Sequence, residues 1–177
     1  MQVRFTTALG LPVVDDEMTE QFGSISGILI HPDTGRVEGF FVRIPAFLRS
    51  FELFLSTMDI LRWGLRVIVR DASVLAPLEE RIRLLPLLEE KRLFLGQPII
   101  TESGKKVGAC RDVQFDTQFF MVEWIWPKGF FRWGTPIPVS QILEVRSDAI
   151  IIKDTDVTHT EKVEEEVPIL QSMPEVA

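Results

Sequence analysis

The stretch at residues 9–14, LGLPVV, recurs at residues 95–100 as LGQPII. In both places a polar turn follows, and then a second apolar run that begins at a glycine, Gly23 in the first copy and Gly108 in the second. This second glycine lies 13 positions after Gly10 in the first copy and 12 positions after Gly96 in the second. The same order of signals in both places indicates two copies of one structural unit, produced by a duplication.

Each copy shows the pattern of short antiparallel strands separated by turns. Residues 31–35, HPDTG, combine the proline, aspartate and glycine of a turn, and they predict a β-hairpin that continues into residues 36–44. Gly27, inside the preceding strand, suggests a bulge or a close backbone approach. A single helical turn, at residues 56–61 or 139–143, is expected before the last strand of each copy.

Between the copies the spacing of the apolar residues changes to that of a helix. The residues at spacings of three and four are Leu75, Leu78, Ile82 and Leu85. Pro77 suits a first helical turn, and Pro86 is expected to end or bend this helix before a second short one. Such a linker is apolar on one side. We therefore expect it to pack against the barrels and to hold the two halves together.

The predicted fold class is mainly β, with two small antiparallel β-barrels in tandem joined by a short helical linker. The predicted divisions are a first barrel at residues 1–76, the linker at 77–93, a second barrel at 94–156 and an acidic flexible tail at 157–177. Residues 155–177 hold six acids and one base, so they account for most of the formal net charge of -7. The rest of the chain is nearly neutral, which argues against a nucleic-acid binder with a large basic field.

Both copies resemble PRC-barrel domains, the small β-barrels first described in the H subunit of the photosynthetic reaction centre. The matching features are Gly-x-Pro and two β-branched residues at 10–14 and 96–100, a glycine that begins the second strand (Gly23 and Gly108), a helical turn with Ser56-Thr57 or Ser140, and a last strand ending in Arg70-Asp71 or Lys153-Asp154. The resemblance covers about residues 6–76 and 92–156. It implies barrels that bind other macromolecules and carry no catalytic residues.

Members of this family occur in the reaction-centre subunit, in the C-terminal half of a bacterial ribosome-maturation factor, and in small proteins linked to cell division or sporulation. This sequence departs from the first by lacking a membrane helix and from the second by lacking the N-terminal RNA-facing domain. Neither specific role is therefore carried over to this chain.

Composition favours a soluble globular protein, because apolar residues make up 46% of the chain and charged residues 25%. Cys110 is the only cysteine, so an intramolecular disulfide is excluded. The most apolar neighbourhood, residues 40–58, is interrupted by Arg43, Arg49 and Glu52, which argues against membrane insertion. We expect a cytoplasmic protein.

Groups for catalysis or metal binding are scarce. His31 falls in a predicted turn and His159 in the tail, and Cys110 is expected to be a buried small hydrophobe. Asp15-Asp16-Glu17 lacks the glycine-punctuated pattern of a calcium loop, and Gly104-Lys105 lacks the rest of a phosphate-binding loop. The sequence predicts no enzyme, no metal site and no cofactor.

One loop stands out, at residues 126–134 with the sequence WPKGFFRWG. The candidate partner-binding residues are Trp126, Lys128, Phe130, Phe131, Arg132 and Trp133. Loops that carry aromatic and arginine side chains often contact partners. The alternative is that these rings close one end of the barrel or pack against the other copy, an interpretation slightly favoured for Trp126 and Phe131.

Two functions follow from these features. The first is a non-enzymatic adaptor that binds a protein partner through its barrel surfaces or the aromatic loop. The second is an RNA- or ribosome-associated factor in which Lys128 and Arg132, with Arg62, Arg66 and Arg70, contact phosphates while the rings stack on bases. A homodimer formed through sheet edges or through the loop is a further expectation.

Overall fold

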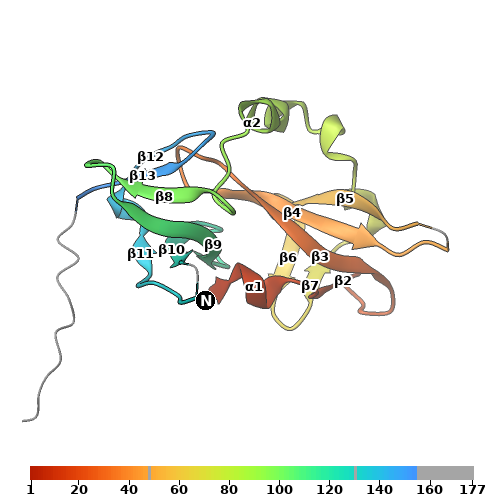
Figure 1. The fold of residues 1–177 in the computed structure, drawn as a ribbon. Helices are drawn as coiled ribbons and strands as arrows, with labels where there is room; N and C mark the ends of the chain where they lie inside the picture. Colours follow the sequence, from red (N-terminus) through yellow and green to blue (C-terminus); the bar gives the residue numbers. More distant parts are fainter. Residues whose placement is uncertain (48, 130, 155–177) are drawn as a thin grey trace, which may run out of the picture.

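Two curled β-sheets, joined by a helical linker, form most of the protein (Figure 1). The computed structural model describes residues 1–47, 49–129 and 131–154. The strands of the first sheet are β2 (Pro12–Val14), β3 (Gln21–Ile30), β4 (Val37–Ile44), β5 (Phe51–Ser56), β6 (Ile60–Trp63) and β7 (Val67–Val69). Those of the second are β1 (Gln2–Arg4), β8 (Pro98–Thr101), β9 (Lys106–Asp116), β10 (Val122–Lys128), β11 (Ile137–Pro138), β12 (Ile142–Val145) and β13 (Ile150–Ile152).

The helices are short. They are α1 (Phe5–Ala8), η1 (Thr57–Asp59), η2 (Ala72–Val74), η3 (Leu78–Glu80), η4 (Ile82–Leu84), α2 (Leu85–Glu90) and η5 (Val139–Gln141). η1 and η5 are the predicted helical turns before the last strand of each copy, and the Ser56 side chain accepts a hydrogen bond from the backbone N–H of Met58 at the start of η1. None of the helices in the described residues has the length and apolar character needed to span a membrane.

The two sheets have the same strand order, β5-β4-β3-β2-β7-β6 and β11-β10-β9-β8-β13-β12. Neighbours in these orders are antiparallel apart from one parallel pair in each sheet, β2 with β7 and β8 with β13. The repeated hexapeptide has the same role in both: Gly10 and Gly96 have φ of 83° and 86°, and their N–H groups donate to Ile25 and Cys110 at 2.8 and 2.7 Å. The predicted mainly β fold class is confirmed.

One hydrophobic core lies between the sheets and contains buried side chains of both. Phe40 and Trp63 of the first sheet meet Phe115 and Phe120 of the second half, with ring centroids 5.6 to 6.2 Å apart across the junction. Because apolar burial is the main stabilising contribution, a shared core means that the halves support each other.

Two hairpin turns exchange backbone hydrogen bonds at this junction. The N–H of Val37, after the β3–β4 turn, donates to the carbonyl of Phe120 at 2.7 Å. The N–H of Val122, after the β9–β10 turn, donates to the carbonyl of Gly35 at 2.9 Å. The predicted turn at residues 31–35 and its counterpart in the second half therefore contact each other reciprocally.

The linker packs on the outer face of the first sheet, and its buried positions agree only in part with those predicted, since Leu75 and Leu78 are buried as expected. Leu78, Leu84 and Leu87 are buried against Leu29 and Phe54, whereas Ile82 is 79% exposed. The reason is that the segment forms separate short helices, and the backbone leaves helical geometry at Arg81 (φ -91°, ψ 71°), which resets the spacing. Pro86 stands in the first turn of α2, so it begins this helix and does not end the one before it.

The N-terminal residues belong to the second sheet, although they precede the first copy. β1 pairs antiparallel with β9, with Val3 opposite Phe115, and α1 follows it directly. The predicted first unit at residues 1–76 thus contributes one strand to the sheet of the other half. The boundaries at 77–93 and 94–156 stay predictions, and the predicted tail at 157–177 lies outside the described residues.

Candidate binding surface

The loop singled out by its composition is a tight extension of β10. Lys128 and Trp133 form an isolated antiparallel bridge. The N–H of Gly129 donates to the carbonyl of Arg132 at 2.9 Å, and the N–H of Gly134 donates to that of Pro127 at 2.9 Å. These bonds define the backbone on both sides of Phe130, which lies outside the described residues.

The two indole rings of this loop lie beside cations. Trp133 is 47% exposed, and its ring centroid lies 5.0 Å from Cζ of Arg4 and 5.3 Å from Nζ of Lys128. The ring of Trp126, partly buried on β10, lies 4.2 Å from the same Cζ of Arg4. Cation–π contacts of this geometry hold the two indoles against one guanidinium. Trp133 is therefore positioned on the surface by two cations.

Arg4 is itself fixed by Asp112, a completely buried residue of β9. Nε of Arg4 donates to the Asp112 carboxylate at 2.8 Å, and the same carboxylate accepts bonds from the Thr6 N–H (3.0 Å), the Thr6 hydroxyl (2.5 Å) and the Val113 N–H (2.9 Å). A buried carboxylate needs such partners, because its desolvation is costly. The N-terminal segment supplies most of them.

A second contact holds the same segment at the end of β9. The N-terminal ammonium of Met1 donates to the Asp116 carboxylate at 2.9 Å. This bond, together with the N–H groups of Phe119 and Gln118, lowers the pKa of Asp116 below its ordinary value. The strand that carries Arg4 is thus attached to the second half on both sides of that residue.

The structure separates the predicted residues by exposure. Trp126 is partly buried beside Arg4, in line with the packing interpretation, and its Nε1 is buried without a hydrogen-bond partner among the described residues. Phe131 is 84% exposed, so the slight preference for packing was wrong at this position. Lys128 and Arg132 are exposed beside it. The tight turn exposes Phe131, Lys128 and Arg132 together. Their spacing in the sequence does not indicate this shared exposure.

The sequence interpretation missed Arg4, Thr6 and Asp112. Asp112 follows the buried Cys110 by two positions in β9 and directly precedes the buried Val113, and an acid at such a position was a usable signal. Its partners are 106 and 108 positions away in sequence, so nothing local connects them.

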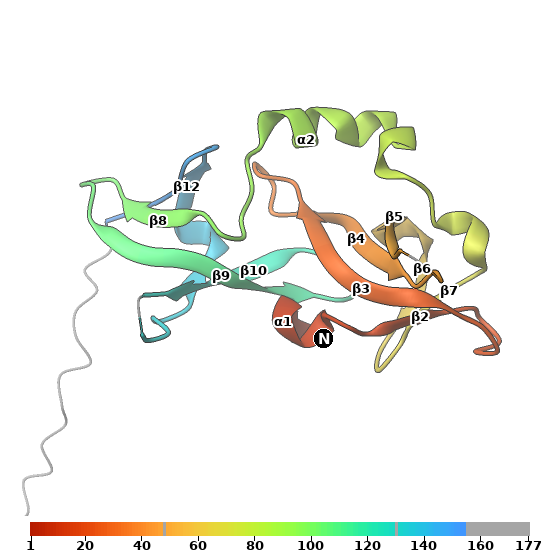
Figure 2. The same ribbon diagram turned by 45° about the vertical axis from the view of Figure 1, so that its right-hand side comes forward.

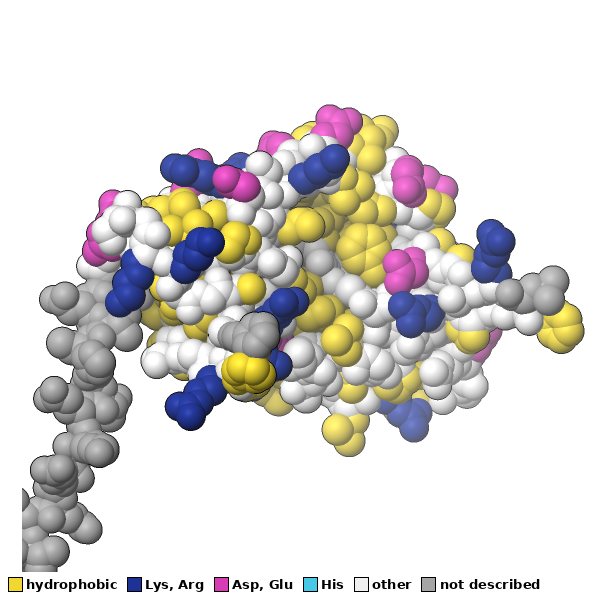
Figure 3. All heavy atoms as spheres, in the orientation of Figure 1, with side chains coloured by type: hydrophobic (Ala, Val, Ile, Leu, Met, Phe, Trp, Pro, Cys, Tyr) yellow, Lys and Arg dark blue, Asp and Glu magenta, His cyan; other side chains and the backbone are white. Residues whose placement is uncertain are grey.

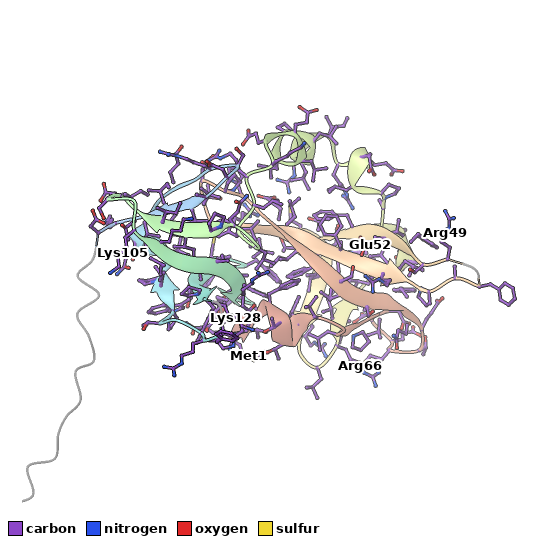
Figure 4. All side chains as sticks on the ribbon, in the orientation of Figure 1. Met1, Arg49, Glu52, Arg66, Lys105 and Lys128 are labelled. Carbon is purple, nitrogen blue, oxygen red and sulfur yellow. The ribbon has the colours of Figure 1, made fainter. Side chains whose placement is uncertain are left out.

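The other arginines proposed for phosphate contacts, Arg62, Arg66 and Arg70, are exposed. The β6–β7 turn and the loop after β10 both lie on the lower rim of the molecule in Figures 1 and 2, and α2 lies on the opposite rim. Figure 4 labels Lys128 and Arg66 on this lower side.

Within the described part of the chain, no carboxylate lies within 4.0 Å of Arg62, Arg66, Lys128 or Arg132. The acidic side chains in Figure 3 are most evident on the upper rim and right-hand side of that view.

The other groups that could take part in catalysis or metal binding have local structural contacts. Cys110 is buried, and burial raises the pKa of its thiol to about 12. Nδ1 of His31 accepts a bond from the Asp33 N–H at 3.2 Å, while His159 lies outside the described residues. In the described ranges, no three histidine, cysteine or acidic side chains are grouped as metal ligands. A hollow of about 310 Å³ under α2 holds Glu38, which is paired with Arg83 at 3.0 Å.

Comparison of the chain with protein-family models and with curated proteins finds no match. The resemblance to PRC-barrel domains therefore stays an expectation from the sequence motifs quoted above. The equal strand order of the two sheets is the structural observation that accompanies them.

Proposed function

We propose that the protein is a cytoplasmic, non-enzymatic adaptor, built from two PRC-like barrels of duplicated origin, that binds a protein partner through the loop after β10. The observation that carries this proposal is the surface formed by Trp133, half-exposed between Arg4 and Lys128, with Phe131 84% exposed in the same turn. Aromatic and arginine side chains at the centre of an interface contribute most of its binding energy.

Pre-organisation supports the same conclusion. Arg4 is held by the buried carboxylate of Asp112, and it lies against the ring of Trp133. A ring that is already positioned loses little conformational entropy on binding. Covering Phe131 removes further apolar surface from water and adds about 2 kcal/mol when the ring is fully buried.

Affinity purification of the tagged full chain from its native cells tests this function. Phe131→Ala with Trp133→Ala should lose the partner captured by the unmodified chain. Phe47→Ala is the matched control, because Phe47 is fully exposed in the corresponding loop of the first half, between β4 and β5. Both variants should keep the melting temperature of the unmodified chain within a few degrees. Equal capture of every partner by the double variant would contradict the assignment, and light scattering shows whether the partner is a second copy.

A second function, RNA binding, is favoured by one observation: Arg66 of the first half and Lys128 of the second half, both exposed, lie on the same lower side of the molecule (Figure 4). Fluorescence anisotropy with a labelled 20-nucleotide single-stranded RNA tests it between 50 and 300 mM salt. Phosphate contacts predict an affinity that falls steeply with salt and is reduced in Arg66→Glu and in Lys128→Glu. An affinity unaffected by salt and by both changes would exclude this function.

A further inference from the structure

The charge of the protein is divided unevenly between its two parts. Residues 1–154 carry 18 bases and 20 acids, whereas residues 155–177 carry one base and six acids. Four of these acids, Glu161, Glu164, Glu165 and Glu166, stand within six positions of one another. A concentrated negative charge of this kind attracts a cationic surface within a Debye length of about 8 to 10 Å.

The described residues include cations on the lower side of the molecule, where Figure 4 labels Arg66 and Lys128. We define the cationic rim as Arg62, Arg66, Lys128 and Arg132, which are exposed and have no carboxylate of the described residues within 4.0 Å. Leu65, 91% exposed in the β6–β7 turn, and Phe131 add apolar surface to it. Among the other exposed arginines of the described residues, Arg43, Arg83 and Arg146 are paired with an acid. Arg36, Arg49, Arg70 and Arg111 are not, and the rim differs from them in combining exposed aromatic and leucine neighbours.

We propose that the acidic segment at residues 155–177 binds the cationic rim of its own chain. Its acids match the rim in charge, and the run VPIL at residues 167–170 suits the rings and leucine beside it. The segment is long enough, because its glutamates at 161–166 lie up to 12 residues beyond Asp154, or about 40 Å of extended chain. A body of about 150 residues has a radius of gyration of about 15 Å, so the rim is within reach.

The last described residue, Asp154, lies beside other lysines, and this makes the proposal specific. Asp154 accepts a hydrogen bond from the Ser103 hydroxyl at 2.8 Å, and Ser103 belongs to the turn that carries Lys105. Figure 4 shows Lys105 at the far end of the molecule from Arg66. Attraction to any nearby cation would favour Lys105 and Lys106, whereas the proposal requires the rim.

This binding would make the segment a competitor for any ligand of the rim. A tethered segment acts at an effective concentration in the millimolar range, so a partner or RNA must displace it. Neutralising the glutamates should therefore raise the affinity of such a ligand several-fold. The proposal itself concerns the isolated chain and does not depend on the adaptor function.

Photo-crosslinking in the purified full chain tests the proposal. The photoreactive residue p-benzoylphenylalanine replaces Phe131, and mass spectrometry identifies the peptides that it joins. The expected products join position 131 to residues 155–177 within one chain at 50 mM salt and fall at least fivefold at 500 mM. The same probe at Phe47 is the control and should give no such product.

Charge variants complete the test. Glu164→Gln with Glu165→Gln and Glu166→Gln should lower the crosslink yield at least fivefold, as should Lys128→Glu with Arg132→Glu. Lys105→Glu with Lys106→Glu is the matched control and should leave the yield unchanged. Products that join two chains, an unchanged yield in the rim variant, or a loss only in the Lys105 and Lys106 variant would each overturn the proposal. Because no partner is present, failure of the adaptor function leaves these outcomes unaffected.

Discussion

Arg4 and Asp112 form an ion pair between the first strand of the chain and the middle of the second sheet. Nε of Arg4 lies 2.8 Å from the carboxylate, and the Asp112 side chain is completely buried, whereas that of Arg4 is 34% exposed. Cζ of the same guanidinium lies 4.2 Å from the ring centroid of Trp126 and 5.0 Å from that of Trp133. The pair therefore connects the stability of the second half to the geometry of the exposed aromatic surface.

Removal of the buried carboxylate should be strongly destabilising. In Asp112→Ala, Arg4 and both donors of Thr6 lose their acceptor, so the free energy of unfolding should fall by about 3 kcal/mol. Urea denaturation measures it. Arg146→Ala, which breaks the exposed pair with Glu144, is the control and should change the value by less than about 0.5 kcal/mol. Equal effects of the two changes would show that the buried pair is not an anchor.

Phe120 should respond in an unusual way to replacement by glycine. It has a φ of 53°, in the left-handed region, and its ring contacts Phe40 and Trp63. Phe120→Ala loses this packing and keeps the backbone strain, whereas Phe120→Gly loses the packing and relieves the strain. Thermal unfolding should show both variants below the unmodified chain, with the glycine variant more stable than the alanine variant by about 0.5 to 1 kcal/mol.

The equivalent position of the other hairpin gives the reverse comparison. Gly35 has a φ of 69°, and its carbonyl accepts the bond from Val122. A Cβ there would meet only ordinary contacts, the nearest being Val139 at 3.6 Å. Gly35→Ala should therefore cost about 1 kcal/mol from strain alone. A neutral effect in thermal unfolding would show that the turn relaxes without loss.

Cys110 should make stability depend on alkaline pH. Burial raises the pKa of its thiol from the ordinary value of 9.0 to about 12, so above pH 9 the unfolded chain loses this proton and the folded chain keeps it. The unfolded chain then binds fewer protons, and the free energy of unfolding falls as pH rises, by about 1 kcal/mol from the thiol between pH 9 and 10. Urea denaturation at several pH values should show a steeper decline for the unmodified chain than for Cys110→Ala. Parallel declines would exclude a buried neutral thiol.

The linker offers a comparison between two apolar residues two positions apart. Leu84 is 2% exposed under the first sheet, whereas Ile82 is 79% exposed. Leu84→Ala should lower the free energy of unfolding by about 2 to 4 kcal/mol, because it leaves a cavity. Ile82→Ala should change it by less than about 0.5 kcal/mol. Similar losses in denaturant unfolding would contradict the observed burial.

Local signals predicted much of the fold. Gly10 and Gly96 mark the same left-handed turn in both sheets, and the turn at residues 31–35 joins β3 to β4 as expected. The linker shows the limit of this reasoning, because Ile82 and Leu84 have the same apolar character and only the backbone at Arg81 decides which is buried.

For the candidate site, the sequence by itself determined the composition of the loop at residues 126–134 and its place after a strand. Turn residues, apolar periodicity and charge runs are local patterns that extend over a few positions. They can therefore be recognised in the sequence before the tertiary structure is known. The tertiary structure decided the rest: Arg4 reaches Asp112, two indoles lie close to its guanidinium, and Phe131 is exposed. These contacts join residues more than 100 positions apart, and they exist because a shared core brings two sheets together.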